Sequence, residues 1–176
     1  MKASDPDLPP LPRGYEERMA RHSEPPRLQP AGRDTSGRAA FLVPEAAKAW
    51  ESMRRCAAGS GVVLLLVSAY RSVERQREIV AGKIAAGVPL ADILVVSAYP
   101  GFSEHHSGRA VDVGAPGCDD LTERFEDTPQ FAWLSEHAGR FGFALTYPRG
   151  NRCAIAYEPW HWCFGGSDAP GEGSHG

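Results

Sequence analysis

The sequence has no hydrophobic stretch long enough to cross a lipid bilayer. Its longest apolar run extends from Val62 to Val67, whereas a membrane-spanning helix needs about 20 consecutive apolar residues. A run this short is typical of a buried β-strand. We therefore expect no transmembrane anchor in this chain.

The sequence also lacks an excess of positive charge. Lysine and arginine total 19 and aspartate and glutamate total 22, so the formal net charge is -3, and the isoelectric point is near 6.1. Nucleic acids and anionic membrane surfaces are bound through clustered positive charge, so the composition gives no reason to expect such partners. No internal repeat is visible, and 176 residues fit a single domain.

The N-terminal segment contains no apolar core of the kind that signal peptides have. Residues 1–38 carry seven prolines among many charges, and we expect them to form an irregular extension. Two locations stay open: the cytoplasm, or the periplasm or cell envelope if a signal peptide has been removed. Residues 167–176 are rich in glycine and serine and are expected to form a flexible tail. The folded domain is therefore placed at residues 39–166.

Cysteine is scarce in this chain. Cys56, Cys118, Cys153 and Cys163 are compatible with two disulfides in an oxidising compartment and equally with four free thiols. Cys153 and Cys163 lie symmetrically about Glu158, so a hairpin in this stretch would bring them face to face. This pairing is a hypothesis, which labelling of free thiols in the unreduced protein would remove if all four cysteines react.

The remaining pattern predicts helices first and a run of strands later. Apolar residues at helical spacing predict a helix over residues 44–57, and a second helix follows Ser72, a favourable N-cap, to about residue 86. Residues 128–141 form a third predicted helix that begins at Thr128 and Pro129. Short strands are expected at 62–68, 110–113, 143–147, 153–157 and 160–164. This order is typical of an α+β domain with an antiparallel sheet flanked by helices.

Two segments more than forty residues apart carry side chains that suit a metal-dependent hydrolase. The first extends from Ser103 to Asp112 (SEHHSGRAVD), and the second from Glu158 to His161 (EPWH). A catalytic zinc uses three protein ligands and keeps one position for water, and a nearby base takes that water's proton. The candidate ligands are His105, Asp112 and His161, and the candidate base is Glu158.

Each of these residues also has an explanation without a metal. Asp112 lies in an expected strand, where aspartate is uncommon, and a solvent-facing edge position would explain it. His105 stands in a Gly/Ser-rich loop and would then be an ordinary solvated histidine. His161, between two tryptophans, would be a hydrogen-bonded, half-buried histidine. The joint arrangement favours one metal site over three separate explanations.

A metal site places two demands on the local backbone. In a plain strand, positions three apart point to opposite faces, so Glu158 and His161 would not both face one metal. We therefore expect a turn or bulge at Pro159. Gly108 is explained by a positive φ or by a close approach of the backbone to a ligand.

These segments resemble those of the VanY-type zinc D-alanyl-D-alanine carboxypeptidases and their L,D-carboxypeptidase relatives. The shared pattern is Ser-x-His-x-x-Gly-x-Ala-x-Asp followed by Glu-x-Trp-His. Residues 68–72 (SAYRS) with Gln76 are similar to the family's Ser-Gly-Tyr-Arg-Ser segment and its following glutamine, and residues 133–148 resemble the helix and strand before the second motif. The resemblance covers about residues 40–166. Ala69 replaces a usual glycine, and Cys163 stands where an arginine commonly occurs.

The resemblance implies a hedgehog/DD-peptidase-like fold, a zinc cofactor, and removal of a terminal D-alanine from peptidoglycan stem peptides or muropeptides. It also implies that Arg71, Gln76 and Ser103 bind substrate. The chemistry of Arg71 agrees, because an exopeptidase must hold a free carboxylate and a guanidinium pairs with a carboxylate through two parallel hydrogen bonds. Glu158 would accept the water proton and deliver it to the departing amine.

Other interpretations stay open at this point. Arg71 would otherwise form a salt bridge that holds the corner between strand and helix, and Ser103 would brace the loop before His105. Cleavage of D-Ala-D-Ala is favoured over three alternatives: cleavage of the L,D bond of a tetrapeptide, a peptidoglycan endopeptidase activity, and a non-catalytic zinc-containing peptide-binding module. We expect a monomer with no nucleic-acid partner.

Overall fold

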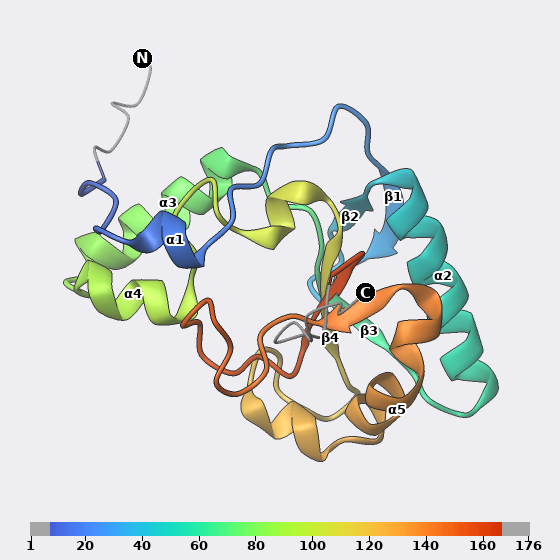
Figure 1. Ribbon diagram of the computed structural model, residues 1–176. Coiled ribbons are helices and arrows are strands. Elements are labelled where there is room, and N and C mark those ends of the chain that lie inside the picture. Colours follow the sequence, from blue (N-terminus) through green and yellow to red (C-terminus); the bar gives the residue numbers. More distant parts are fainter. Residues whose placement is uncertain (1–7, 167–176) are drawn as a thin grey trace, which may run out of the picture.

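The computed structural model describes residues 8–166 and is drawn in Figure 1. The helices are α1 (Tyr15–Arg18), α2 (Pro44–Gly59), α3 (Val73–Ala85), α4 (Leu90–Val96) and α5 (Pro129–His137). The strands are β1 (Gln29–Arg33), β2 (Ala39–Leu42), β3 (Leu65–Ser68), β4 (Ala110–Gly114), β5 (Phe143–Leu145) and β6 (His161–Phe164). Short 3₁₀ helices span Glu104–Ser107, Glu123–Asp127 and Ala138–Phe141.

A four-stranded antiparallel sheet lies at the centre of the molecule. Its strand order is β3-β4-β6-β5, and β1 and β2 form a separate antiparallel pair. Figure 1 shows α1, α3 and α4 on one side of the central sheet and α2 and α5 on the other. The architecture is the predicted one, a single α+β domain with helices flanking an antiparallel sheet. In residues 8–166, no helix is both long and apolar enough to span a bilayer.

Alternation along β4 gives the sheet two different faces. Val111 and Val113 pack in the main hydrophobic core, whereas Asp112, between them, lines a cleft on the opposite face. The register pairs Asp112 with His161 on β6, and the next residue of β6, Trp162, returns to the core. One face of the sheet therefore stabilises the fold while the other carries polar side chains.

Two of the predicted helices cover the core face. The buried residues of α2 recur at helical spacing and are Ala46, Ala47, Trp50, Met53 and Ala57. Helix α5 adds Trp133 and Leu134, and it begins as predicted because the Thr128 hydroxyl accepts a hydrogen bond from Phe131 N at 3.2 Å. The side chain of Ser72 caps α3 in the same way, accepting from Arg75 N at 3.0 Å.

The strand and disulfide predictions around residue 155 are wrong. Residues 153–157 form no strand. The Asn151 side chain donates to the carbonyls of Pro148 and Ile155, at 2.8 and 2.7 Å, and Ala154 adopts a φ of +54°. An asparagine that satisfies nearby backbone groups organises a loop in place of a hairpin. Without that hairpin Cys153 does not pair with Cys163, and all four cysteines are free thiols.

The N-terminal segment is more ordered than its prolines suggested. Residues 8–38 include α1 and β1, and β1 pairs with β2 across the proposed boundary at residue 39. Tyr15 and Met19 are buried in a second hydrophobic cluster. Most of residues 8–38 lie outside helices and strands, but the stretch also contains two regular elements and buried side chains that the expectation of an irregular extension did not include. Residues 1–7 and the expected tail at 167–176 lie outside the described residues.

Candidate active site

The first metal-motif segment is shaped by a cap and a glycine. The Ser103 hydroxyl accepts a hydrogen bond from His105 N at 3.3 Å at the start of the 3₁₀ helix. Gly108 ends that helix with a φ of +68°, and a Cβ there would lie 3.0 Å from Leu28 and 3.1 Å from Val43. The positive φ predicted for this glycine is therefore confirmed, and the close neighbours are side chains of the protein itself. The chain then enters β4, which carries Asp112.

The second metal-motif segment turns as predicted. The amide of His161 donates to the carbonyl of Glu158 at 3.1 Å, which closes a turn across Pro159 and Trp160. Glu158 and His161 consequently line the same cleft, and Glu158 Oε2 lies 3.9 Å from His161 Nδ1. The turn therefore brings both side chains to the same side, whereas a straight strand would place them on opposite faces.

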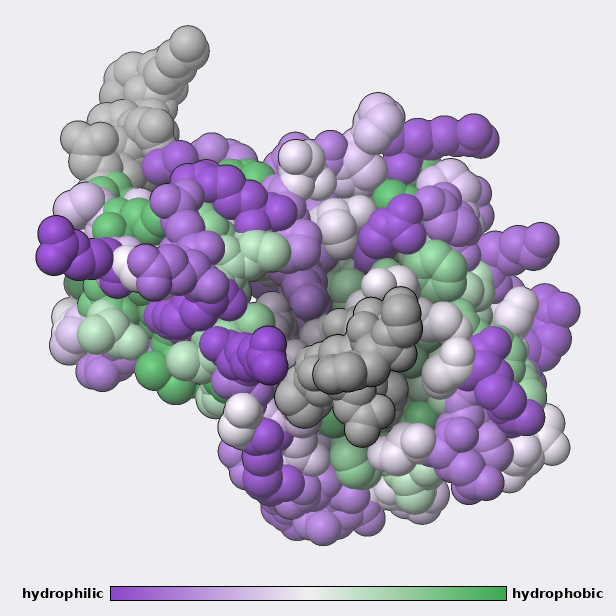
Figure 2. All heavy atoms as spheres, viewed as in Figure 1, coloured by the Kyte–Doolittle hydropathy of each residue, from purple (hydrophilic) through white to green (hydrophobic). Residues whose placement is uncertain are grey.

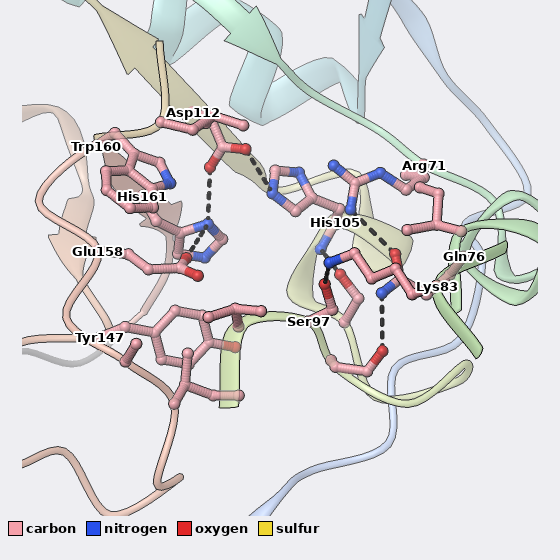
Figure 3. Close-up of a pocket in the computed structure, with 17 residues that line it drawn as sticks. Arg71, Gln76, Lys83, Ser97, His105, Asp112, Tyr147, Glu158, Trp160 and His161 are labelled. Carbon is pink, nitrogen blue, oxygen red and sulfur yellow. Dashed lines mark hydrogen bonds and ion pairs between the residues drawn. The ribbon is translucent and has the colours of Figure 1, made fainter. Parts of the chain in front are cut away.

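His105, Asp112 and His161 converge, although they come from three different elements. One ligand atom from each lies within 4.8 Å of the others, and all three residues are buried. Asp112 stands between the two imidazoles: its Oδ2 is 3.2 Å from His105 Nε2 and its Oδ1 is 3.0 Å from His161 Nδ1. Figure 3 shows these three side chains at one end of the pocket, with Glu158 beside them.

The hydrogen bonds of His105 show that a cation fits between it and Asp112. Its Nδ1 is 2.7 Å from the carbonyl oxygen of Ala69, which can only accept, so a neutral ring carries its proton there. The Nε2 lone pair then faces an Asp112 oxygen. Burial lowers the pKa of His105, which favours this neutral form. Two acceptors that face each other are stabilised by a proton or a metal ion between them, so this pair is suited to binding a metal. Ala69, which departs from the family's glycine, contributes through its backbone.

Glu104 orients the second imidazole, and the sequence alone did not single it out. Its Oε2 lies 2.8 Å from His161 Nε2 and also accepts a hydrogen bond from the Thr146 hydroxyl at 2.7 Å. A proton held between His161 Nε2 and Glu104 leaves the Nδ1 lone pair directed at the metal position. Carboxylate partners of this kind fix the tautomer of metal-binding histidines. The only available signal was an acidic residue directly beside His105.

The spacing of these atoms suits zinc. Zn–N and Zn–O bonds of about 2.0–2.2 Å in a tetrahedron place neighbouring ligand atoms about 3.3–3.6 Å apart. The two Asp112–His distances, 3.2 and 3.0 Å, are close to that value. The donor set of two imidazole nitrogens and one carboxylate is also one that catalytic zinc uses. The residues present therefore fit the group that the sequence predicted.

The electrostatics separate the two glutamates beside His161. Burial raises the pKa of Glu158 to about 7, against the opposing effect of His161. Burial also acts on Glu104, but its hydrogen bonds with His161 and Thr146 outweigh it and bring the pKa of Glu104 to about 2. For His161, hydrogen bonds with Asp112 and Glu104 outweigh burial and raise its pKa to about 10. The two carboxylates that favour a proton on this ring also favour a metal cation at its Nδ1.

The cleft has a volume of about 390 Å³, and the three predicted substrate-binding residues line it. Arg71 donates to Gln76 Oε1 at 3.0 Å and to Ser68 Oγ at 3.2 Å, and the described residues offer it no carboxylate within ion-pair distance. The salt-bridge explanation for Arg71 therefore does not hold in residues 8–166. Gln76 donates to the Ala98 carbonyl at 2.7 Å. Ser103 both braces the loop and faces the cleft.

The backbone fixes Arg71 relative to the metal ligands. The amide of Arg71 donates to the His105 carbonyl at 3.1 Å, and the ring of His106 contacts the Arg71 carbonyl at 2.8 Å through Nδ1. The corner between β3 and α3 is thus hydrogen-bonded to the first metal-motif segment.

Tyr147, which the sequence predicted only as part of a strand, stacks on His161 with ring centroids 4.8 Å apart. In the view of Figure 2, the surface is mostly hydrophilic and is hollowed near its centre, between the part that contains α1 and α4 and the part that contains α5.

Three candidate metal ligands on one side, an open cleft on the other, and a half-buried carboxylate beside them are the parts that a metal-dependent hydrolase needs. Comparison with known families makes the assignment specific. The sequence model of the family described as VanY, D-alanyl-D-alanine carboxypeptidase, matches residues 39–167. The chain belongs to this family.

Individual relatives agree with this assignment. The chain is 33% identical over 153 residues to VanXYC of Enterococcus gallinarum, a bifunctional D-Ala-D-Ala dipeptidase and carboxypeptidase, covering 84% of this chain and 78% of that protein. It is 35% identical over 133 residues, 73% of its length, to the Bacillus subtilis carboxypeptidase homologue YodJ, and it spans about half (48%) of that relative.

Solved structures share the fold. The LD-carboxypeptidase LdcB superposes with a TM-score of 0.73 at 31% identity, over 80% of this chain and 69% of LdcB. VanYB, solved in complex with D-alanine-D-alanine, gives a TM-score of 0.65 at 28% identity, over 85% of this chain and 83% of that one. The hedgehog/DD-peptidase-like fold expected from the motifs is therefore confirmed.

Proposed function

We propose that this chain is a zinc D-alanyl-D-alanine carboxypeptidase that removes the terminal D-alanine from peptidoglycan stem peptides. One observation carries the proposal: His105, Asp112 and His161 converge beside Glu158 in a cleft that also contains Arg71. Membership of the VanY family and the D-alanine-D-alanine bound by VanYB support the substrate class.

The roles of the residues follow from their positions. His105, Asp112 and His161 hold the zinc, which when bound supplies Lewis acidity and lowers the pKa of water. Glu158 accepts the proton of the attacking water and returns it to the departing amine. Its pKa of about 7, raised by burial, suits a group that must both accept and release a proton near neutral pH.

Arg71 holds the free carboxylate that distinguishes a carboxypeptidase substrate. Its guanidinium is half-buried at the cleft wall, is oriented by Gln76 and Ser68, and has no carboxylate partner among the described residues. A guanidinium without an anionic partner binds an anionic ligand favourably, because folding has already removed part of its hydration. Ser103 also lines the cleft.

The test is mass spectrometry of purified stem pentapeptide and tetrapeptide after incubation with zinc-loaded protein. A chelator-treated sample of the same protein is the control. We expect the pentapeptide to lose one alanine, and this loss to stop after chelation. Loss from the tetrapeptide alone would replace the proposal with an L,D-carboxypeptidase. If zinc is bound and neither peptide is cleaved, the proposal is wrong.

We also infer that the protein acts in the cell envelope, because peptidoglycan lies there. The support for this location is the substrate class. Fractionation of cells followed by detection with an antibody tests it, and recovery of the protein only in the cytoplasmic fraction would contradict it.

A further inference from the structure

A second cationic group lies in the cleft, on α3 beyond Gln76. Lys83 is in the last turn of that helix and donates a hydrogen bond from Nζ to the Ser97 hydroxyl at 2.7 Å. Ser97 is the C-cap residue directly after α4, and the side chains of both residues line the cleft. Figure 3 shows Lys83 extending into the pocket from the side of Gln76, with Glu158 and Trp160 on the opposite side.

The pairing of Lys83 differs from that of its neighbours on α3. Arg75 lies 2.6 Å from Glu78 and Arg77 lies 3.9 Å from Glu74, so the solvent face of the helix balances its own charges. Lys83 is half-buried, and in the part of the chain that the structure describes no carboxylate lies within ion-pair distance of it. Its hydrogen-bond partner is the neutral hydroxyl of Ser97.

Lys83 and Ser97 together offer more hydrogen-bond donors than they use with each other. An ammonium group carries three N–H donors, and Ser97 accepts one of them. Two donors of Lys83 and the hydroxyl proton of Ser97 therefore stay available to a ligand. Three donors with one positive charge, facing a cleft, are suited to a carboxylate. A neutral or cationic ligand would leave this charge half-buried without compensation.

The distance along α3 indicates which carboxylate of the substrate can reach this position. Gln76 contacts Arg71, and Lys83 follows Gln76 by seven residues, which is about 10.5 Å along a helix axis. Two peptide residues in extended form cover about 7 Å, and a long side chain covers the remainder. If Arg71 holds the terminal carboxylate, the group near Lys83 belongs to the side chain of the third stem residue.

We propose that Lys83 and Ser97 form a second carboxylate subsite, which binds an acidic side chain on the third residue of the stem peptide. This inference rests on the proposed function. It predicts preference for a third residue that is a diamino dicarboxylic acid, such as diaminopimelate, over lysine, whose side chain ends in an ammonium group without a carboxylate.

The experiment compares three pentapeptides that differ only at the third residue: diaminopimelate, its side-chain amide, and lysine. Each is assayed with the zinc-loaded wild-type protein and with Lys83→Met, Lys83→Glu and Ser97→Ala. The control is Lys48→Met, which removes an exposed helical lysine of α2, outside this cleft. We expect Lys83→Met to lower kcat/KM for the diaminopimelate peptide by about tenfold to a hundredfold, the loss of one charge-assisted hydrogen bond.

This loss should arise mainly in KM and should be absent for the amide and lysine peptides. Lys83→Glu should reverse the preference in favour of lysine, which a purely structural role would not produce. An equal loss for all three peptides would overturn the proposal. The proposal would also be overturned if the effect of Lys83→Met disappeared only for a pentapeptide amidated at its terminal carboxyl group. Lys83 would then bind that terminal carboxylate.

Binding measurements keep the two proposals separable. Calorimetry of the same peptides with Glu158→Ala, and with Glu158→Ala combined with Lys83→Met, reports affinity without turnover. If the wild-type protein cleaves nothing but binds the diaminopimelate peptide in a Lys83-dependent way, the proposed function fails and the subsite stands. If it cleaves all three peptides equally well, the subsite fails and the function stands.

Discussion

Glu104 and Glu158 both contact His161, yet their surroundings give them opposite protonation behaviour. Glu104 accepts hydrogen bonds from His161 and Thr146, which bring its pKa to about 2, so it is an anion at any pH near neutral. Burial brings the pKa of Glu158 to about 7. Environments that separate two such pKa values separate two chemical roles. Glu104 is suited to orienting an imidazole, and Glu158 to exchanging a proton.

The role of Glu158 can be tested by its removal. In Glu158→Ala the three ligand side chains are intact, so the variant should bind zinc as the wild type does. Turnover should fall by about 10²- to 10⁴-fold, the usual contribution of a general base. Metal analysis and the rate of D-alanine release are the measurements. Glu136→Ala, which changes an exposed carboxylate of α5, serves as the control. Hydrolysis by Glu158→Ala at the wild-type rate would show that this carboxylate is not the base.

The role of Glu104 is expected to appear in metal affinity. Glu104→Gln removes the charge that faces His161 Nε2, although an amide of similar size remains in place. Substitution of such carboxylate partners typically lowers metal affinity by about 10- to 100-fold. Competition with a chromophoric chelator measures the dissociation constant for zinc. If Glu104→Gln binds zinc as tightly as Glu136→Gln, the orientation of His161 does not depend on Glu104.

At the scale of elements, local sequence signals predicted the scaffold well. The periodicity of α2 and the caps at Ser72 and Thr128 act over a few residues, and the structure confirms them. The alternation of side chains in the strand expected at 110–113 likewise places Asp112 on the face opposite Val111 and Val113, as the structure shows. The predicted strand at residues 153–157 failed because Asn151 satisfies backbone groups that a strand would have used. The periodicity of apolar residues does not reveal this competition between side chain and backbone.

The convergence of the three candidate metal ligands was predictable for a different reason. Their side-chain chemistry and spacing are restrictive, so the resemblance of two short motifs was sufficient. Contacts formed across long sequence separations were not predictable in this way. Glu104 and His161 are 57 residues apart, and the stacking of Tyr147 on His161 depends on how β5 and the following loop fold back. Such contacts depend on tertiary packing, which no local pattern encodes.

The turn between the first metal motif and β4 gives an element-scale prediction. In Gly108→Ala, the new Cβ meets Leu28 and Val43 at 3.0 and 3.1 Å, in addition to a φ of +68°. Gly37→Ala has a similar φ of +81° but no atom within 4 Å of the new Cβ, so it is a matched control. A left-handed alanine costs about 1–2 kcal/mol. Gly108→Ala should lower the unfolding free energy by more than Gly37→Ala does, as measured in denaturant titrations. Equal losses would mean that the turn accommodates a methyl group.

At the scale of the whole molecule, the N-terminal segment is joined to the active site through the second hydrophobic cluster. That cluster contains Tyr15, Met19, Leu94, Phe102, Tyr147 and Ile155. The Tyr15 hydroxyl accepts a hydrogen bond from Tyr99 N at 2.9 Å, and its ring packs against Phe102 with centroids 5.1 Å apart. Tyr147, in the same cluster, stacks on His161, and its carbonyl accepts from Glu158 N at 3.1 Å. Tyr15 precedes residue 39, where the family match begins, yet it belongs to the packing that supports the site.

This arrangement predicts that a substitution far from the metal motifs affects the whole domain. Tyr15→Ala empties a fully buried position, and deletion of a buried aromatic ring typically costs about 3–5 kcal/mol. Tyr15→Phe keeps the ring and removes only the acceptor for Tyr99 N, which should cost about 1 kcal/mol because a half-buried donor loses its partner.

Denaturant unfolding of the two variants, beside Glu17→Ala on the exposed side of α1, measures these differences. Zinc affinity provides a second measurement, under conditions in which each variant is still folded. Tyr15→Ala should weaken zinc binding, because Tyr147 loses the packing that holds it against His161, whereas Glu17→Ala should not. If Tyr15→Ala has the same unfolding free energy as Glu17→Ala, residues 8–38 do not contribute to the stability of the domain. The domain would then begin near residue 39, as the sequence alone predicted.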